Sequence, residues 1–560
     1  MSSSLLFFSR FSLFSALRQR WASVAPNSAA RASVALSALL VVLGLALRAR
    51  GYLFERSAFW LDECSWAMRI FDRPLVQSLI RPIGFLAVSK FLALTFSNTE
   101  TVLRWLPWAA GIAATLSAPL LARELFRTLA PRVLFVAVIA LSPLAIDFSK
   151  EFKPYSVSLA LHLALVLTTL RYSLRERRAD LARALVLAAI GSLFAQDLVL
   201  AFPGVFLVLG LTARKRGRAE LAATCAVALV VIAGLALQYF LMWKHLPRDH
   251  TEFWGKKYNV FHTPAEPAGY LGWSLERFEE MVAMPGIRRT SWSADWLSPF
   301  ARELLRGLDE FVWAASFAAG VAVIVWQRRV REGLLLVLPL AILWSFNRAG
   351  FWPLGAFRTN VFTVVYSGAV AAMAFDFRAA EQSSWRALAP ALLLVLLPLA
   401  LFERSWHEHK RTFTYDSTFP RALEWLAAKE PASPAAPPEL VVLDRRSCDP
   451  FRYYTQYNQR VASRVADVIA HKYVVKCSSA DEALPAELLA GGPAGRRFAV
   501  LHVTRPFDLM LKGGRFGNLR VVQRQDVGSH TVVALMPGPS ERKPPVKIRL
   551  STAEADDDED

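Results

Sequence analysis

The sequence contains little charge for its length. Only 20% of its 560 residues are Asp, Glu, Lys or Arg, whereas 54% are hydrophobic. Soluble domains usually carry about 25% charged residues. Apolar runs recur between residues 33 and 403, and several are long enough to cross a bilayer core of about 30 Å. The composition therefore argues against a soluble enzyme and predicts a polytopic helical membrane protein, because helices satisfy their own backbone hydrogen bonds in lipid.

Motifs that identify several common enzyme classes are absent as well. No Walker-type phosphate loop, His-Glu-x-x-His zinc-protease motif or Gly-x-Ser-x-Gly nucleophile motif occurs. The four cysteines include no Cys-x-x-Cys pair of the kind that binds zinc. Cys448 and Cys477 fall in the same C-terminal part, where an oxidising compartment would permit a disulfide. Their sequence separation alone leaves that pairing open.

Acidic residues are also scarce relative to basic ones, 46 against 65. The excess arginines cluster in short loops between apolar runs, so the positive-inside rule accounts for them. No nucleic-acid partner is expected, because no basic stripe with interleaved aromatics lies outside these loops. Counting the arginine-rich loops as cytoplasmic predicts about eleven membrane spans and one interfacial helix at 82–96. The predicted spans are 33–50, 102–122, 131–147, 155–171, 182–196, 198–212, 219–242, 309–327, 333–347, 357–376 and 387–403.

This count divides the chain into four parts. Residues 1–32 form a cytoplasmic N-terminal segment, and 33–403 form an all-α membrane domain with outer loops at 51–101 and 243–308. Residues 404–548 form a small extracytoplasmic α/β domain, because an odd number of spans with an inside start leaves the tail outside. Its predicted helices are 420–430 and 461–475, and its predicted strands are 440–444, 498–503 and 531–536. The acidic end, 549–560, is predicted to be disordered.

An acidic pair, Asp62-Glu63, stands in the first outer loop. Carboxylates at a membrane are costly and tend to be functional. Asp62 could also serve as a helix N-cap, and Glu63 could be a first-turn glutamate favoured by the helix dipole. The second outer loop carries Lys150, Glu151 and Lys153, and a late outer motif ends at Arg358. A surface ion pair for Glu151 and an interfacial anchor for Arg358 are the corresponding structural interpretations.

Three outer segments together resemble the GT-C membrane glycosyltransferases. They are Trp60-Leu61-Asp62-Glu63 followed by Pro82-Ile-Gly-Phe-Leu and residues 99–107, then residues 147–155, and then Trp352-Pro353-Leu354-Gly355-Ala-Phe-Arg358. The resemblance extends to protein O-mannosyltransferases, the aminoarabinose lipid A transferase and enzymes that decorate lipopolysaccharide core sugars. It covers roughly residues 33–403. Lys153 stands where the family more often has arginine, and Trp352 where it has tyrosine.

The resemblance implies transfer of a sugar from a polyprenyl-phosphate donor to a lipid, glycan or protein acceptor. Such chemistry needs a base for the acceptor hydroxyl and cations for the departing phosphate. The expected catalytic residues are Asp62, Glu63 and Glu151. Lys150, Lys153, Tyr155 and Arg358 are expected to bind the donor. A divalent metal stays open, with Glu63 as its candidate ligand, because metal dependence varies within the superfamily.

Two other functions compete with this interpretation. A transporter or flippase of lipid-linked glycans would be expected to show charges near the middle of the membrane and repeated halves. A structural assembly protein would recruit partners through the tail domain but would leave Asp62-Glu63 without a role. The Ala- and Arg-rich composition favours a bacterial plasma membrane facing a periplasm. Asp197, at an outer turn, is a further candidate for lining the site, whereas His162 is expected to pack between helices.

Overall fold

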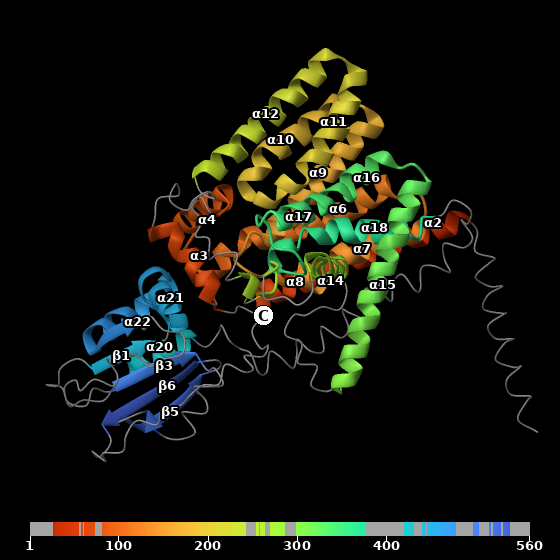
Figure 1. The fold of residues 1–560 in the computed structure, drawn as a ribbon. Helices are drawn as coiled ribbons and strands as arrows, with labels where there is room; N and C mark the ends of the chain where they lie inside the picture. Colours follow the sequence, from red (N-terminus) through yellow and green to blue (C-terminus); the bar gives the residue numbers. More distant parts are fainter. Residues whose placement is uncertain are drawn as a thin grey trace, which may run out of the picture.

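The chain folds into a large helical body with a small mixed α/β domain at one end (Figure 1). The computed structural model describes residues 26–54, 58–59, 61–72, 81–241, 254–256, 258–263, 269–285, 298–376, 419–429, 439–443, 445–477, 497–502, 515–516, 519–527 and 530–537. The predicted span 387–403 and the acidic end 549–560 lie outside these residues.

The N-terminal half of the helical body contains the first outer loop and the central helices. Its elements are α2 (Pro26–Ala49), the π-helix η1 (Arg50–Phe54), α3 (Leu61–Asp72), α4 (Ile83–Thr95), α5 (Glu100–Leu103), α6 (Trp105–Leu125), α7 (Leu129–Leu141), α8 (Pro143–Asp147), α9 (Tyr155–Arg175), α10 (Arg178–Phe194), the 3-10 helix η3 (Gln196–Leu200), α11 (Phe202–Arg216) and α12 (Arg218–Leu241).

The second half of the body is shorter. Its elements are α14 (Tyr270–Val282), α15 (Pro299–Trp326), α16 (Val330–Leu336), α17 (Leu338–Arg348), the 3-10 helix η5 (Arg358–Asn360) and α18 (Thr363–Met373).

Helix α7 lies in the centre of the body. It is apolar on every side, as expected of a helix that no lipid or water touches, and residues 133–141 are all buried. Arg48, at the end of α2, donates to the carbonyls of Ile139 and Ala140 at 3.1 and 2.7 Å. These bonds satisfy carbonyls that the end of α7 leaves without helical partners. A buried arginine thereby joins α2 to the core.

Several predicted spans are interrupted in the structure. The segment 131–147 breaks into α7 and α8 because Pro143 lacks the N–H needed to continue the hydrogen-bond ladder. The segment 333–347 breaks into α16 and α17 just before Pro339. The predicted interfacial helix at 82–96 is α4, whose thirteen residues are too few for a span.

Among the described residues, five helices are long and apolar enough to cross a membrane. They are Glu100–Leu125, Tyr155–Arg175, Arg218–Phe240, Glu303–Trp326 and Val330–Arg348. Helices α10 and α11 correspond to predicted spans, but charged residues at their ends shorten the apolar stretch. Helices α2, α7 and α18 contribute shorter apolar segments. The chain is a helical membrane protein, and the count of about eleven spans is not confirmed.

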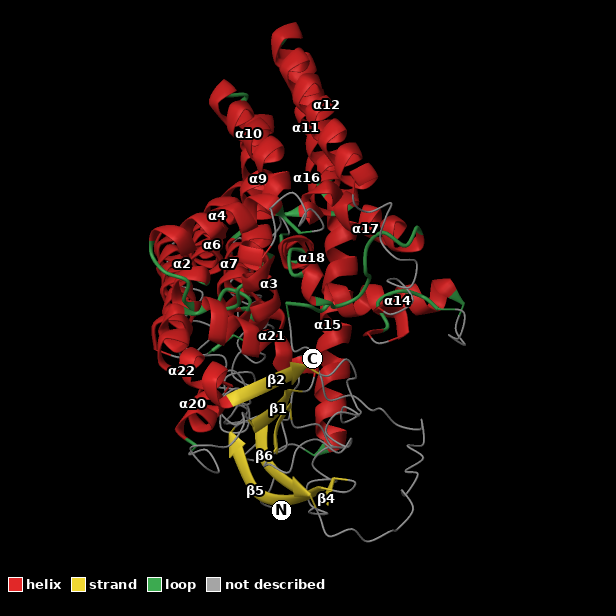
Figure 2. Cartoon of the chain, turned by 90° about the vertical axis from the view of Figure 1, so that its left-hand side faces the viewer, coloured by secondary structure: helices red, strands yellow, loops and turns green. Residues whose placement is uncertain are grey.

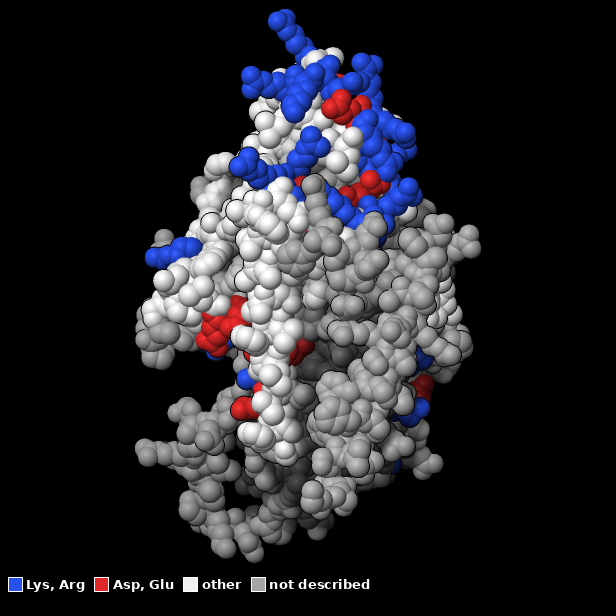
Figure 3. Space-filling model, turned by 90° about the vertical axis from the view of Figure 1, so that its right-hand side faces the viewer, with Lys and Arg blue, Asp and Glu red and all other residues white. Residues whose placement is uncertain are grey.

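Basic side chains gather at one end of the helical body, where α11 gives way to α12 (Figure 3). Arg214, Lys215 and Arg216 are exposed there, and so are Arg175 and Arg178. The C-terminal domain lies at the opposite end (Figure 1). This separation matches the asymmetry that the positive-inside rule predicts for a membrane protein. The orientation of the termini across the membrane stays a prediction.

The C-terminal domain combines helices with one sheet. Its elements are α20 (Phe419–Ala428), β1 (Glu439–Leu443), α21 (Arg445–Arg452), the π-helix η6 (Tyr453–Tyr457), α22 (Gln459–Lys472), β2 (Tyr473–Cys477), β3 (Arg497–His502), β4 (Arg515–Phe516), β5 (Leu519–Val527) and β6 (His530–Pro537). The strand order in the sheet is β2-β1-β3-β6-β5-β4. Strand β1 pairs in parallel with β2 and β3, whereas β3–β6, β6–β5 and β5–β4 are antiparallel. Helices cover the sheet on the side that faces the helical body (Figure 2).

This domain contains elements that the sequence did not predict, α21, β2, β4 and β5, and one predicted helix is shorter. The helix predicted at 461–475 ends at Lys472, and residues 473–477 form strand β2. Tyr473, Val474 and Val475 have the aromatic and β-branched side chains that favour strands, and pairing with β1 extends them. Cys448 on α21 and Cys477 on β2 form a disulfide, with their Cα atoms 5.7 Å apart.

Candidate active site

Asp62 lies among cations from two distant parts of the chain. It occupies the first turn of α3, one residue inside a helix that begins at Leu61. Its Oδ2 atom is 2.9 Å from Nη1 of Arg358 and 3.3 Å from Nζ of Lys153. The Asp62 side chain keeps 32% of its surface exposed, whereas that of Lys153 keeps 3%. The structure thus brings Asp62 together with basic residues of the two later segments that were predicted to lie on the same side of the membrane.

The charges around Asp62 keep it ionised. Burial by itself would raise its pKa, but Lys153, Arg358 and Arg81 together hold the pKa below its usual value. The pKa of Lys153 is lowered as well, to about 8, because burial and the neighbouring guanidiniums outweigh the pull of Asp62. The site therefore contains a carboxylate that can accept a proton and an ammonium group that titrates close to neutral pH.

Glu63, the next residue, has a different environment. It is fully buried, and its Oε1 atom accepts hydrogen bonds from Nε of Arg104 at 2.8 Å and from the amide of Phe152 at 2.5 Å. Nη2 of Arg104 donates to its Oε2 atom and, at 3.1 Å, to the carbonyl of Ala58. Glu63 thus ties α3 to the start of α6 and to the loop that carries Lys153.

The loop between α8 and α9 supplies the remaining predicted residues. Glu151 has one buried carboxylate oxygen, Oε2, without a hydrogen-bond partner among the described residues. Burial, with Asp147 and Glu63 nearby, raises the pKa of Glu151 well above its usual value, and Lys153 and Arg358 only partly oppose this. The raised pKa favours the protonated form of the Glu151 carboxyl over its ionised form. Tyr155 begins α9 and packs edge-on against Phe148, with ring centroids 5.0 Å apart. Lys150, half-buried, precedes Glu151.

Sequence reasoning did not assign two basic residues that the structure brings to this region. The guanidinium of Arg81 lies over the Trp66 ring, 4.2 Å from its centroid, and Nζ of Lys153 lies 5.0 Å from the same centroid. Burial and the nearby Arg69 lower the pKa of Arg81 to about 9, although Asp62 opposes them. Its Nη1 atom is buried and has no hydrogen-bond partner among the described residues. Arg104 is the second such residue, as the partner of Glu63.

A signal for both arginines exists in the sequence. The positive-inside rule leaves arginine uncommon in short outer segments, yet Arg81 and Arg104 fall within the predicted outer loop 51–101 or at its border. Arginines that depart from this charge bias need another reason to be there. In the structure, that reason is a carboxylate in each case, Asp62 near Arg81 and Glu63 beside Arg104.

The described residues contain no group of three or more His, Cys, Asp or Glu side chains that could hold a metal ion. Both oxygens of Glu63 already accept hydrogen bonds, and the guanidinium of Arg104 balances its charge. These contacts do not fit a metal ligand, because coordination would have to displace the guanidinium. His245 and His250, which have a weak metal-type spacing, lie outside the described residues.

Asp197 and His162 meet inside the helical body. The hydroxyl of Ser158 donates to Asp197, whose other oxygen is 3.7 Å from Nε2 of His162. Nδ1 of His162 is 2.6 Å from the hydroxyl of Tyr366, and its ring stacks on Phe362. These contacts join α9, η3 and α18. They agree with the packing role expected for His162.

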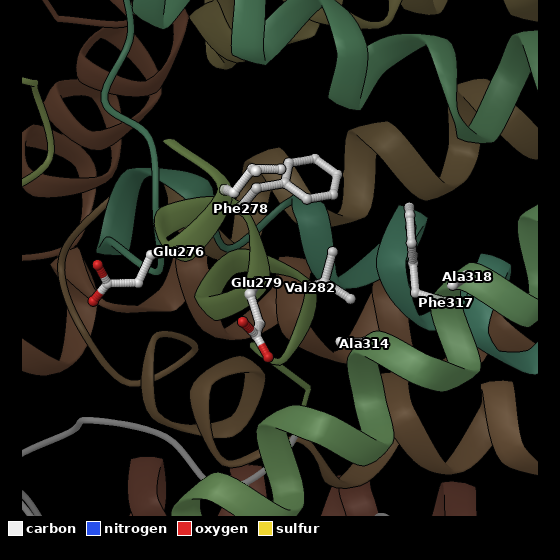
Figure 4. Close-up of a pocket in the computed structure, with 8 residues that line it drawn as sticks. Glu276, Phe278, Glu279, Val282, Ala314, Phe317 and Ala318 are labelled. Atoms are coloured by element: carbon white, nitrogen blue, oxygen red, sulfur yellow. The ribbon is translucent and has the colours of Figure 1, made fainter. Parts of the chain in front are cut away.

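A cavity of about 490 Å³ lies elsewhere, between α14 and α15. Phe278, Val282 and Phe317 face the space between the two helices, whereas the carboxylate of Glu276 points away from it (Figure 4). None of the predicted site residues lines this cavity. The candidate active site is defined by the charged residues around Asp62 and not by this apolar space.

Comparisons with known proteins give structural similarities only. No family model matches the chain, and no curated protein matches it. ArnT from Cupriavidus metallidurans in the apo state is 12% identical with a TM-score of 0.49, over 90% of this chain and 98% of that chain. The same protein bound to undecaprenyl phosphate is 14% identical with a TM-score of 0.45, over 89% of this chain and 97% of that chain. The Archaeoglobus fulgidus oligosaccharyltransferase complex with Zn and sulfate is 14% identical with a TM-score of 0.39, over 78% of this chain and 62% of that chain.

Proposed function

We propose that this protein is an integral-membrane glycosyltransferase that moves a sugar from a polyprenyl-phosphate donor to an acceptor hydroxyl. The observation that carries the proposal is the position of Asp62, within hydrogen-bonding reach of two cations from separate outer segments. An ionised carboxylate beside paired cations supplies both of the functions that this transfer requires. The transporter interpretation is not favoured, because the charged cluster is built from helix ends and loops.

The reaction follows from the charges. The donor phosphate binds Arg358 and Lys153, and Arg81 adds a third cation beside them. This binding competes with Asp62 for the same cations and releases the carboxylate toward the acceptor. Asp62 takes the proton from the acceptor hydroxyl, and the acceptor oxygen forms a bond to the anomeric carbon. The bond from that carbon to the phosphate oxygen breaks, and its electron pair stays on the polyprenyl phosphate.

The other predicted residues support this step. Glu151 donates a hydrogen bond to the donor when its carboxyl is protonated, the form that its raised pKa favours. Tyr155 and Lys150 complete the donor side. Glu63 acts through its bonds to Arg104 and Phe152, which hold α3 and the Lys153 loop in register. Glu63 is therefore proposed as a positioning residue, and the transfer proceeds in one displacement that inverts the anomeric centre.

The acceptor is a lipid, a glycan or a protein on the face of the membrane where the C-terminal domain lies. We place the enzyme in a bacterial plasma membrane, with this domain in the periplasm. A mass comparison of lipids, glycans and proteins between a deletion strain and its parent identifies the acceptor and the sugar. The same comparison serves as the assay for variants that are returned to the deletion strain.

Asp62→Asn tests the proposal directly. The variant keeps the size of the side chain and removes the proton acceptor, so the sugar-bearing product is expected to disappear while the protein reaches its normal level in the membrane. Glu303→Gln is the matched control, because Glu303 is an exposed acid at the beginning of α15. Product formation by Asp62→Asn would show that Asp62 is not the base. A trapped covalent adduct between sugar and enzyme would exclude the single displacement.

A further inference from the structure

The C-terminal domain and the first outer loop share one hydrophobic core. Phe59, Cys64 and Phe85 of the loop region belong to the same buried cluster as Tyr453 and Val461 of the C-terminal domain. Helix α21 lies directly against α3, as both views of the fold show (Figures 1 and 2). Separate modules joined by a linker would each bury their own apolar residues. This core instead crosses the boundary between the two parts.

The contacts at this boundary concentrate on Phe59, three residues before Asp62. The amide of Phe59 donates a hydrogen bond to the hydroxyl of Tyr454 at 2.5 Å, and both residues are buried. The Phe59 ring packs against Tyr453 at 5.2 Å and against Phe152 at 5.6 Å between centroids. Phe152 immediately precedes Lys153, so a single aromatic side chain connects the C-terminal domain to both catalytic segments.

Polar contacts secure the edge of the same interface. Nη2 of Arg452 is 3.3 Å from Oδ2 of Asp72 at the end of α3, and the Tyr457 hydroxyl donates to the other oxygen of Asp72. The side-chain amide of Asn98 donates to the carbonyl of Tyr457 at 2.8 Å. The C-terminal domain therefore holds α3 at its beginning through Tyr454 and at its end through Arg452.

We propose that Tyr454 is a positioning residue for Asp62, and that the C-terminal domain is a structural part of the catalytic unit and not a separate recruitment module. This inference rests on the proposed function of the Asp62 site. The Phe59 amide lies at the N-terminal approach to α3, where the helix does not supply partners for amides. The Tyr454 hydroxyl supplies one. Without it, the segment before α3 is free to shift, and Asp62 moves with the helix relative to Arg358 and Lys153.

Tyr454→Phe removes this hydroxyl and little else. We expect kcat to fall roughly 10- to 100-fold, because a shift of about 1 Å at a reacting group has an effect of that size. The KM for the polyprenyl-phosphate donor is expected to stay within about twofold, because the cations that hold the phosphate remain. Tyr473→Phe is the matched control. Its hydroxyl is also buried and donates to the carbonyl of Leu426, but this bond lies wholly inside the C-terminal domain.

Amide hydrogen exchange gives a second readout that does not depend on the reaction. Exchange at residues 58–72 is expected to accelerate in Tyr454→Phe and to stay unchanged in Tyr473→Phe. If the wild-type protein transfers no sugar, the proposed function fails, and the exchange result still decides whether the domain positions α3. If the wild-type protein transfers sugar and Tyr454→Phe has the same kcat and the same amide exchange as the wild type, the inference is overturned.

A charge exchange tests the other end of α3. Arg452→Asp alone places two carboxylates in contact and is expected to lower kcat and speed exchange in α3. The double variant Asp72→Arg with Arg452→Asp restores an opposite-charge pair but not the hydrogen bond from Tyr457 to Asp72, so both readouts are expected to recover in part. Failure of the double variant to recover either readout, when it folds as the wild type does, would contradict a clamp formed by this pair.

Discussion

Replacing the two adjacent acids, Asp62 and Glu63, is expected to have different effects on the protein. Glu63→Ala removes the carboxylate that balances Arg104 and accepts from the amide of Phe152. The guanidinium of Arg104, whose side chain is only 10% exposed, then stays buried without its counter-charge. The defect is expected to be a loss of stability first, with transfer activity lost as a consequence.

The magnitude follows from burial. Removing one partner of a buried ion pair costs about 3–5 kcal/mol, because the remaining charge loses its compensation without regaining water. Glu63 is fully buried and accepts hydrogen bonds from Arg104 and from the amide of Phe152, so the cost belongs at the upper end of that range. By contrast, Glu176→Ala breaks an ion pair with Arg216 in which both side chains are about 40% exposed, and such pairs contribute about 0–1 kcal/mol.

The assay is unfolding of purified protein in mild detergent, followed by denaturant titration for Glu63→Ala, Arg104→Ala and the double variant. The double variant is expected to be more stable than the sum of the single effects predicts, because no unpaired charge remains. Glu176→Ala serves as the exposed control. A loss of less than about 1 kcal/mol for Glu63→Ala, or strict additivity in the cycle, would refute the assignment of a buried pair.

Two further predictions concern the charge of Lys153 and the packing of α15. Transfer is expected to fall as pH rises through about 8, the lowered pKa of buried Lys153, and Lys153→Arg should move this fall to higher pH. The free energy of unfolding is expected to rise over the same pH range. Between pH 8 and 10.5, the ordinary pKa of a lysine, Lys153 binds its proton more tightly in the unfolded chain than in the folded protein, so raising the pH favours the folded state. If Lys153→Arg leaves the dependence of transfer on pH unchanged, the loss of transfer at high pH comes from the titration of another group. Gly320→Ala should destabilise the protein by about 1–3 kcal/mol, because a Cβ there would overlap the Val370 carbonyl oxygen, whereas Gly210→Ala meets nothing within 4 Å. Equal stability of these two variants in detergent would contradict the close packing of α15 on α18.

Local features of the sequence were sufficient for the class of protein and for most helices. A helix at 82–96 was predictable from its apolar run, which is too short to span a bilayer. Proline positions decide where predicted spans break, as at Pro143, but a span count based on hydropathy alone passes over such breaks. The strand at 473–477 escaped prediction because the preceding helical pattern runs directly into it and pairing with β1 decides its form.

The candidate site divides in a similar way. Asp62, Lys153 and Arg358 could be selected because each is a charged residue in a predicted outer segment, and the structure brings these three together. The role of Glu63 could not be predicted from its position beside Asp62. Adjacent residues on a helix point in directions about 100° apart, so one acid faces the cations of the site and the other enters the core.

Composition and periodicity determined that this chain is a helical membrane protein and selected the acids and bases of its predicted outer segments, because these properties depend on near neighbours in the sequence. Only the tertiary structure decided which charges meet. Glu63 and Arg104 are 41 residues apart, and Phe59 and Tyr454 are 395 residues apart. No local pattern encodes contacts across such separations in the sequence. The contacts form when α3 packs against the loop of Lys153 on one side and against the C-terminal domain on the other.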